Sequence, residues 1–110
     1  SYTEVVANRE AHADPEKQHA MNQLMILLQG ALEARTQVLV KLNVADAVSL
    51  DKVIGLLPSM KAPTVNELHG GAGYAVETVV PKAKINILIP DLKDAGATDI
   101  IELPLAKIVH

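Results

Sequence analysis

The sequence contains 110 residues, of which 49% are hydrophobic and 21% are charged, with a formal net charge of -3. A chain of this length and composition can bury enough apolar surface to fold as a globular unit, so extended disorder is not expected. There are two Tyr, no Phe, no Trp and no Cys. Nucleic-acid binding is not expected, because it depends on clustered basic side chains and on aromatic platforms. Disulfides and thiolate metal sites are excluded, a membrane-spanning segment is not apparent, and a cytoplasmic location is the expectation.

The first predicted element is a helix from about Pro15 to Ala34. Asp14 can accept hydrogen bonds from the free amides of the first turn, Pro15 suits the first helical position, and Glu16 complements the helix dipole. Apolar residues recur along it at helical spacing. We expect residues 1–36 to be the end of a preceding region with a linker helix, and residues 37–110 to be a separate domain.

The second region begins with a predicted strand over residues 37–42, which is short and rich in β-branched residues. Asn43 is expected to close this strand. A short amphipathic helix should follow, capped by Ser49 and ended by Pro58, because the residue before a proline is disfavoured in the helical conformation.

Residues 63–68 and 74–80 are predicted to form a β-hairpin around the glycine-rich turn 69–73. Such a turn can also present amides to a phosphate, but here it joins two strands and does not open a helix. A plain hairpin is therefore the favoured interpretation.

A third helix is predicted over residues 82–95, with Pro90 producing a kink and Gly96 ending the helix in a left-handed conformation. Residues 99–103 read as the last strand. Pro104 cannot donate to a neighbouring strand, so this strand is expected at a sheet edge over part of its length.

The order strand, helix, strand, strand, helix, strand indicates an α+β fold of the ferredoxin-like βαββαβ type, with two helices on one face of an antiparallel sheet. Alternation along residues 74–80 leaves neither sheet face wholly polar. An uncovered and partly apolar sheet face favours burial by another subunit, so we expect a homo-oligomer.

Three stretches together resemble the C-terminal regulatory domain of long-form ATP phosphoribosyltransferases, which is an ACT-like or nitrogen-regulatory-protein-like fold. They are residues 28–35 (LQGALEAR), residues 56–65 (LLPSMKAPTV) and residues 76–109. Residues 7–11 and 14–17 resemble the junction with the catalytic lobes that precede this domain in the family. The acidic, Gly/Thr-rich loop that holds phosphoribosyl pyrophosphate in those lobes has no match here, so no catalytic residue is expected in this chain.

The resemblance implies the first step of histidine biosynthesis, in which ATP and phosphoribosyl pyrophosphate form phosphoribosyl-ATP with Mg²⁺ in the parent enzyme; no cofactor is expected in this chain. It further implies that L-histidine binds between neighbouring subunits as a feedback inhibitor. Binding would favour an inhibited hexamer over active dimers, with trimer contacts through this domain.

Carried over position by position, the effector pocket comprises five residues of this chain: Asn43, Met60, Thr64, Val79 and Asp99. Thr64 matches the family. Asn43 stands where the family can have Asp, and it offers only neutral hydrogen bonds in place of a carboxylate. Met60, Val79 and Asp99 occupy pocket positions without matching residue types.

Other interpretations stay open at this point. Asn43 and Thr64 can serve local backbone bonds without any ligand. The four histidines, His12, His19, His69 and His110, show no metal-ligand spacing, and Glu77 and Glu102 form an acid and base pair only if strand register brings them together. Alternative functions are a free-standing ferredoxin-like small-molecule sensor and a purely structural oligomerisation domain.

Overall fold

The computed structural model describes residues 14–58 and 62–110, so Met60 and His12 lie outside the described residues. Two compact units are present: one contains the first described helix and residues 106–110, and the other runs from Thr36 to Leu105.

The first unit is built on helix α2 (Pro15–Ala34), whose predicted start is confirmed. The Asp14 carboxylate accepts hydrogen bonds from the backbone N–H of Glu16 and Lys17 at 2.9 and 3.4 Å. These bonds satisfy amides that have no partner within the helix.

Residues 106–110 lie against the last turns of α2. The Ile108 N–H donates to the Gly30 carbonyl at 3.0 Å, and His110 Nε2 lies 2.8 Å from Glu33 Oε1. A Cβ at residue 30 would lie 2.8 Å from the Ile108 carbonyl oxygen. The close approach of these two backbones therefore depends on glycine.

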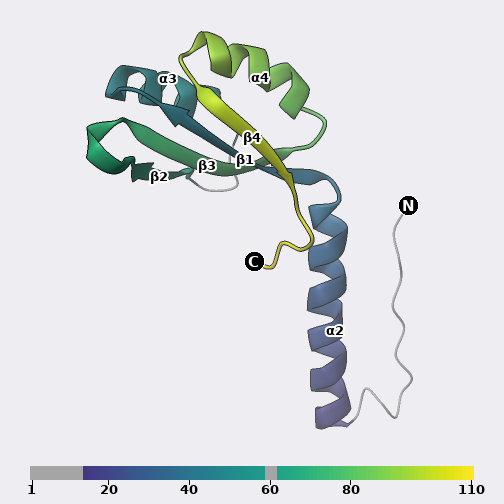
Figure 1. The fold of residues 1–110 in the computed structure, drawn as a ribbon. Coiled ribbons are helices and arrows are strands. Elements are labelled where there is room, and N and C mark those ends of the chain that lie inside the picture. Colours follow the sequence, from purple (N-terminus) through teal and green to yellow (C-terminus); the bar gives the residue numbers. More distant parts are fainter. Residues whose placement is uncertain (1–13, 59–61) are drawn as a thin grey trace. The chain divides into compact units, whose positions relative to one another are not determined.

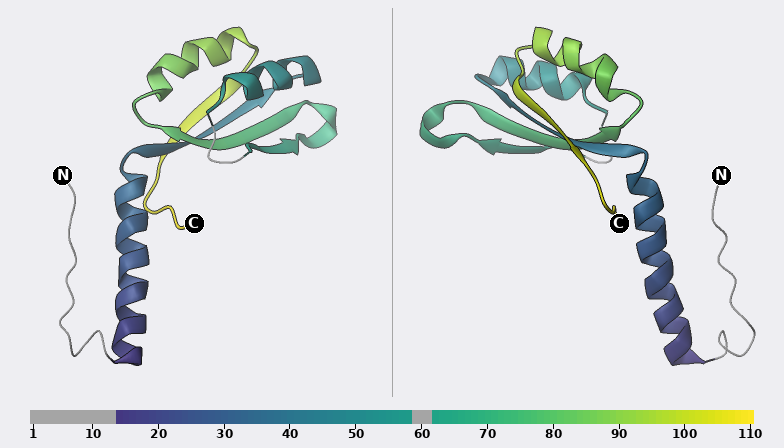
Figure 2. Two further views of the ribbon diagram at one scale, coloured as in Figure 1. Left: turned by 180° about the vertical axis from the view of Figure 1, so that it is seen from behind. Right: turned by 45° about the vertical axis from the view of Figure 1, so that its right-hand side comes forward.

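The second unit contains a sheet of β1 (Gln37–Val44), β2 (Thr64–Glu67), β3 (Tyr74–Pro81) and β4 (Thr98–Pro104). The strand order is β2-β3-β1-β4, and every neighbouring pair is antiparallel. Helices α3 (Ala47–Leu56) and α4 (Ile85–Asp94) both lie on the same face of this sheet (Figure 1 and Figure 2). The predicted ferredoxin-like arrangement is confirmed, and β4 is an edge strand, as Pro104 indicated.

The core lies between the sheet and the two helices. The even-numbered residues of β1 are buried, and they pack with residues of β3, α3 and α4. The fully buried core side chains include Val38, Val40, Leu42, Val44, Val53, Val76, Val80 and Leu92. An aliphatic core of this kind follows from a sequence that has no Phe or Trp.

Three predicted boundaries differ from the structure by two or three residues: the end of β1, the start of α3 and the start of α4. Strand β1 continues through Asn43, because this residue pairs with Ala75 on one side and with Thr98 on the other. The cap of α3 is Asp46 and not Ser49: the Ser49 N–H donates to the Asp46 carboxylate at 2.7 Å. This hydrogen bond is the main cause that holds the pKa of Asp46 below its ordinary value of 3.8.

Helix α4 begins at Ile85, three residues later than predicted. The preceding residues form a turn, in which the Lys82 N–H donates to the Thr36 carbonyl and the Lys84 N–H to the Pro81 carbonyl. Pro90 lies inside the helix, and Gly96 follows it with a positive φ of 107°, as expected for a glycine that ends a helix.

Candidate functional site

The sheet face turned away from α3 and α4 is called the open face here. Its members follow from the strand register and from the burial of the alternate residues on β1 and β3. It carries Leu39, Lys41 and Asn43 from β1, Thr64 and Asn66 from β2, Ala75, Glu77 and Val79 from β3, and Ile101 and Leu103 from β4.

The open face is partly apolar, as the sequence predicted. Leu39 pairs with Val79 on one side and Leu103 on the other, which gives an apolar row across three strands. Ile101 and Leu103 retain 46% and 43% exposure in this chain. Lys41 is the cross-strand neighbour of Glu77, so two residues of opposite charge lie on adjacent strands near the middle of the face.

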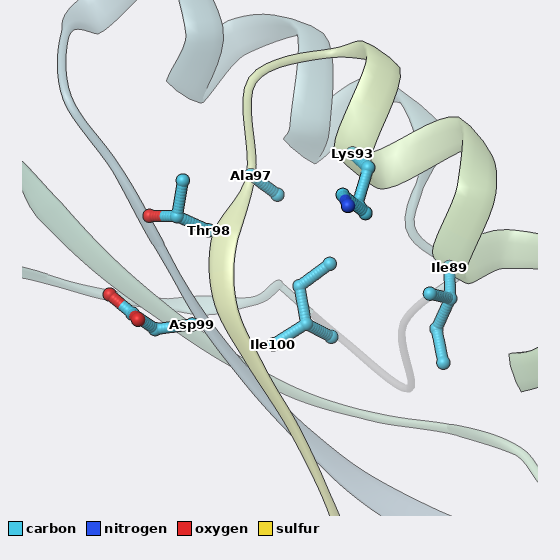
Figure 3. Close-up of a pocket in the computed structure, with 6 residues that line it drawn as sticks. All are labelled: Ile89, Lys93, Ala97, Thr98, Asp99 and Ile100. Atoms are coloured by element: carbon cyan, nitrogen blue, oxygen red, sulfur yellow. The ribbon is translucent and has the colours of Figure 1, made fainter.

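A β-bulge interrupts the open face on β4. Asn43 pairs with Thr98 and Lys41 with Ile101, so Asp99 and Ile100 together lie opposite a single β1 residue. Asp99 has a φ of 51°, in the left-handed region that few side chains adopt. Figure 3 shows the consequence: Ile100 points toward α4, whereas Thr98 and Asp99 both point away from it.

The bulge brings two of the predicted site residues together. Asn43 Nδ2 donates to Asp99 Oδ2 at 3.2 Å, and the Thr98 hydroxyl donates to the Asn43 carbonyl at 3.5 Å. These three residues form a polar cluster at one end of the open face. Carboxylate and amide oxygens in such a cluster can accept hydrogen bonds from an ammonium or another donor.

Thr64 and Val79 lie on the same face but apart from this cluster. Thr64 pairs with Glu77, which pairs with Lys41. Thr64 is therefore two strands and two residues away from Asn43, which places their Cα atoms about 12 Å apart at ordinary strand spacings. Val79 pairs with Leu39, about 14 Å from Asn43 by the same measure. One amino acid bound at Asn43 and Asp99 therefore does not contact Val79 of the same chain.

A groove of about 430 Å³ lies between α4 and β4. It is lined by Ile89, Lys93, Ala97, Thr98, Asp99 and Ile100, shown as sticks in Figure 3. Its size falls within the range of small-molecule sites. The Asp99 side chain nevertheless projects from the other side of β4 (Figure 3), where it accepts the hydrogen bond from Asn43.

Metal binding finds no support in the described part of the chain, where no three His, Cys, Asp or Glu residues gather into a possible metal site. His110 is instead paired with Glu33. Glu77 lies on the open face, while Glu102 pairs with Val40, whose side chain faces the helices. These two carboxylates therefore lie on opposite faces and form no acid and base pair.

Residues 14–58 and 62–110 therefore do not assemble a site for the Mg²⁺ that the family resemblance implies. No helix among these residues is long and apolar enough to cross a membrane.

Comparison with known proteins identifies a match to the model of the HisG C-terminal domain over residues 34–107. The chain is 44% identical over 109 residues to an ATP phosphoribosyltransferase of Pelotomaculum thermopropionicum and 46% identical over 109 residues to one of Desulforudis audaxviator. A third such enzyme, from Desulfosudis oleivorans, is 43% identical. Each alignment covers 99% of this chain and 37% of the relative, so the chain spans a little over a third of their length.

Proposed function

This chain belongs to the family of HisG C-terminal domains, and on that premise we propose that it is the regulatory domain of an ATP phosphoribosyltransferase. In this proposal, catalytic lobes of the same parent chain join ATP to phosphoribosyl pyrophosphate with Mg²⁺, in the cytoplasm. The regulatory domain binds L-histidine and adjusts that activity. It contributes no group to the chemistry.

The observation that carries the proposal is the composition of the open face. A polar cluster of Asn43, Thr98 and Asp99 stands at one end, and an apolar row of Leu39, Val79 and Leu103 crosses the sheet beside it. An amino acid needs polar partners for its ammonium and carboxylate groups and an enclosed surface for its side chain. A single exposed sheet face supplies polar partners for these two groups, but it does not enclose the side chain of the ligand.

A second copy of the chain would supply the enclosure. Thr64 and Val79 lie about 12 and 14 Å from Asn43, too far for one small ligand to contact all of them within one chain. Two open faces meeting in an oligomer would allow Asn43 and Asp99 of one copy to share a ligand with residues of the other. Burial of Ile101 and Leu103 would stabilise the same contact.

Inhibition follows if L-histidine binds one subunit arrangement more tightly than another. A ligand shifts such an equilibrium only by its difference in affinity for the two states. Coupling of about 1 to 3 kcal/mol is typical, which corresponds to roughly 5- to 150-fold. The favoured arrangement would be a hexamer in which the catalytic lobes are restrained.

The test uses the full-length protein. Formation of phosphoribosyl-ATP is measured against L-histidine concentration, with D-histidine as the control ligand and sedimentation velocity on the same samples. The proposal predicts inhibition by L-histidine together with a shift toward the larger assembly. Full activity and unchanged sedimentation at saturating L-histidine would contradict it.

A structural oligomerisation domain is the second candidate, favoured by the exposed apolar side chains of Ile101 and Leu103. It predicts self-association through the open face with no effect of L-histidine on the melting temperature. A bound effector would raise that temperature, because it stabilises only the folded state.

A further inference from the structure

The direction of the Asp99 side chain results from the bulge in β4. In a regular strand, residues alternate between faces, so the residue after Thr98 would point toward the helices and the buried Leu42. The bulge inserts one extra residue into β4, and Asp99 adopts a left-handed backbone conformation there, with a φ of 51°. The carboxylate is thereby turned away from α4 (Figure 3). There it accepts a hydrogen bond from Asn43 Nδ2.

Asn43 holds the carboxylate in a defined orientation. A carboxylate only accepts hydrogen bonds, so the amide must present Nδ2 to Asp99 Oδ2, which lies at 3.2 Å. The other oxygen of Asp99 and the Oδ1 of Asn43 then remain as acceptors. Within residues 14–58 and 62–110, the structure records no further hydrogen bond or ion pair of the Asp99 side chain.

Among residues 14–58 and 62–110, no lysine forms an ion pair with Asp99. Lys41, on the same face, lies opposite Glu77 in the β1–β3 pairing. Lys93 lies on the α4 side of β4, whereas Asp99 points to the other side (Figure 3). In the described part of the chain, Asp99 has no basic side chain within ion-pair distance. The pair of Asn43 and Asp99 therefore offers one negative charge and two free acceptor atoms to a cation.

We infer that Asp99 is the carboxylate that binds the ammonium group of the effector amino acid, and that Asn43 acts as its positioning residue. The inference rests on the proposed function. The ammonium is the group that carries a full positive charge on a free amino acid at neutral pH, where an imidazole is mostly neutral. Asn43 is neutral where the family can have Asp, but the site keeps its negative charge, because Asp99 on the neighbouring strand carries the carboxylate.

The experiment is calorimetric titration of the full-length protein with L-histidine. Asp99→Asn keeps the shape of the side chain and its tolerance for a left-handed backbone but removes the charge. Loss of a hydrogen bond to a charged group weakens binding about 10- to 100-fold. Asp94→Asn, at an exposed aspartate near the end of α4, is the matched control and leaves the affinity unchanged.

Two further arms separate binding from folding. Asp99→Gly suits the positive φ, so it keeps the melting temperature at or above that of the wild type while the affinity falls. The exchange variant Asn43→Asp with Asp99→Asn returns the carboxylate to the pair and recovers most of the affinity. On the ligand side, 3-(imidazol-4-yl)propionate lacks the ammonium, so it binds weakly and equally to the wild type and to Asp99→Asn.

The outcomes distinguish the inference from the proposed function. If the wild type binds L-histidine and Asp99→Asn binds it equally well, the inference is overturned and the regulatory function stands. If Asp99→Asn and Asp99→Gly lose affinity only together with a lower melting temperature, Asp99 has a structural role and the inference is again overturned. A wild type that binds no L-histidine overturns both.

Discussion

Charged substitutions on the open face provide a quantitative test of its role in assembly. Ile101 and Leu103 are 46% and 43% exposed in the single chain. Complete burial of such a side chain contributes about 1.5 to 3 kcal/mol. The exposed shares of the two side chains together therefore correspond to about 1 to 3 kcal/mol per copy, or roughly a 10- to 100-fold change in the dissociation constant.

We expect the double variant Ile101→Asp, Leu103→Asp to weaken self-association by at least this factor, because the aspartates would also have to be desolvated. Sedimentation velocity over a range of protein concentrations measures the effect. The control is Ile87→Asp: Ile87 is 72% exposed but lies on α4, in the helical layer. Equal sedimentation of the wild type and the double variant, or dissociation of the Ile87 variant alone, would refute the assignment of the interface to the open face.

Three other variants test parts of the fold. Leu92→Ala empties a site with 0% exposure and should lower the free energy of unfolding by about 3 to 5 kcal/mol in denaturant titration; a change below about 1 kcal/mol would contradict the core assignment. Asp46→Ala should lower the melting temperature at pH 7. The difference in melting temperature between this variant and the wild type should vanish as the pH falls through the native pKa of Asp46, which lies below 3.8, because the protonated acid no longer caps α3 as an anion. A difference that persists in acid would argue against the cap. Gly30→Ala should speed hydrogen exchange of the Ile108 amide, since the added Cβ would lie 2.8 Å from the Ile108 oxygen; unchanged exchange would show that the tail bond does not need glycine.

Local chemistry made most elements predictable from the sequence. Asp14 with Pro15 fixes the start of α2, and Pro104 restricts the last strand to an edge. Boundaries that depend on partners were less predictable. The sequence predicts that Asn43 closes β1, but pairing on both sides keeps this residue inside the strand. Ser49 and Asp46 both suit the cap of α3, and the structure places Asp46 there, three residues before Ser49.

The candidate site was predictable only as a set of positions. Asn43 and Asp99 are 56 positions apart, and their hydrogen bond depends on the register of β1 and β4, which one sequence does not determine. Thr98 was missed altogether. A signal was present in residues 98–101, where two polar residues are followed by two apolar ones, which breaks strand alternation as a bulge does.

Hydrogen exchange of the full-length protein with and without L-histidine tests the proposed regulatory site most directly. We predict slower exchange at Asn43 and at residues 98–101, with amides of α3 unchanged. Protection confined to other regions, or no change at saturating L-histidine, would contradict an effector site on the open face.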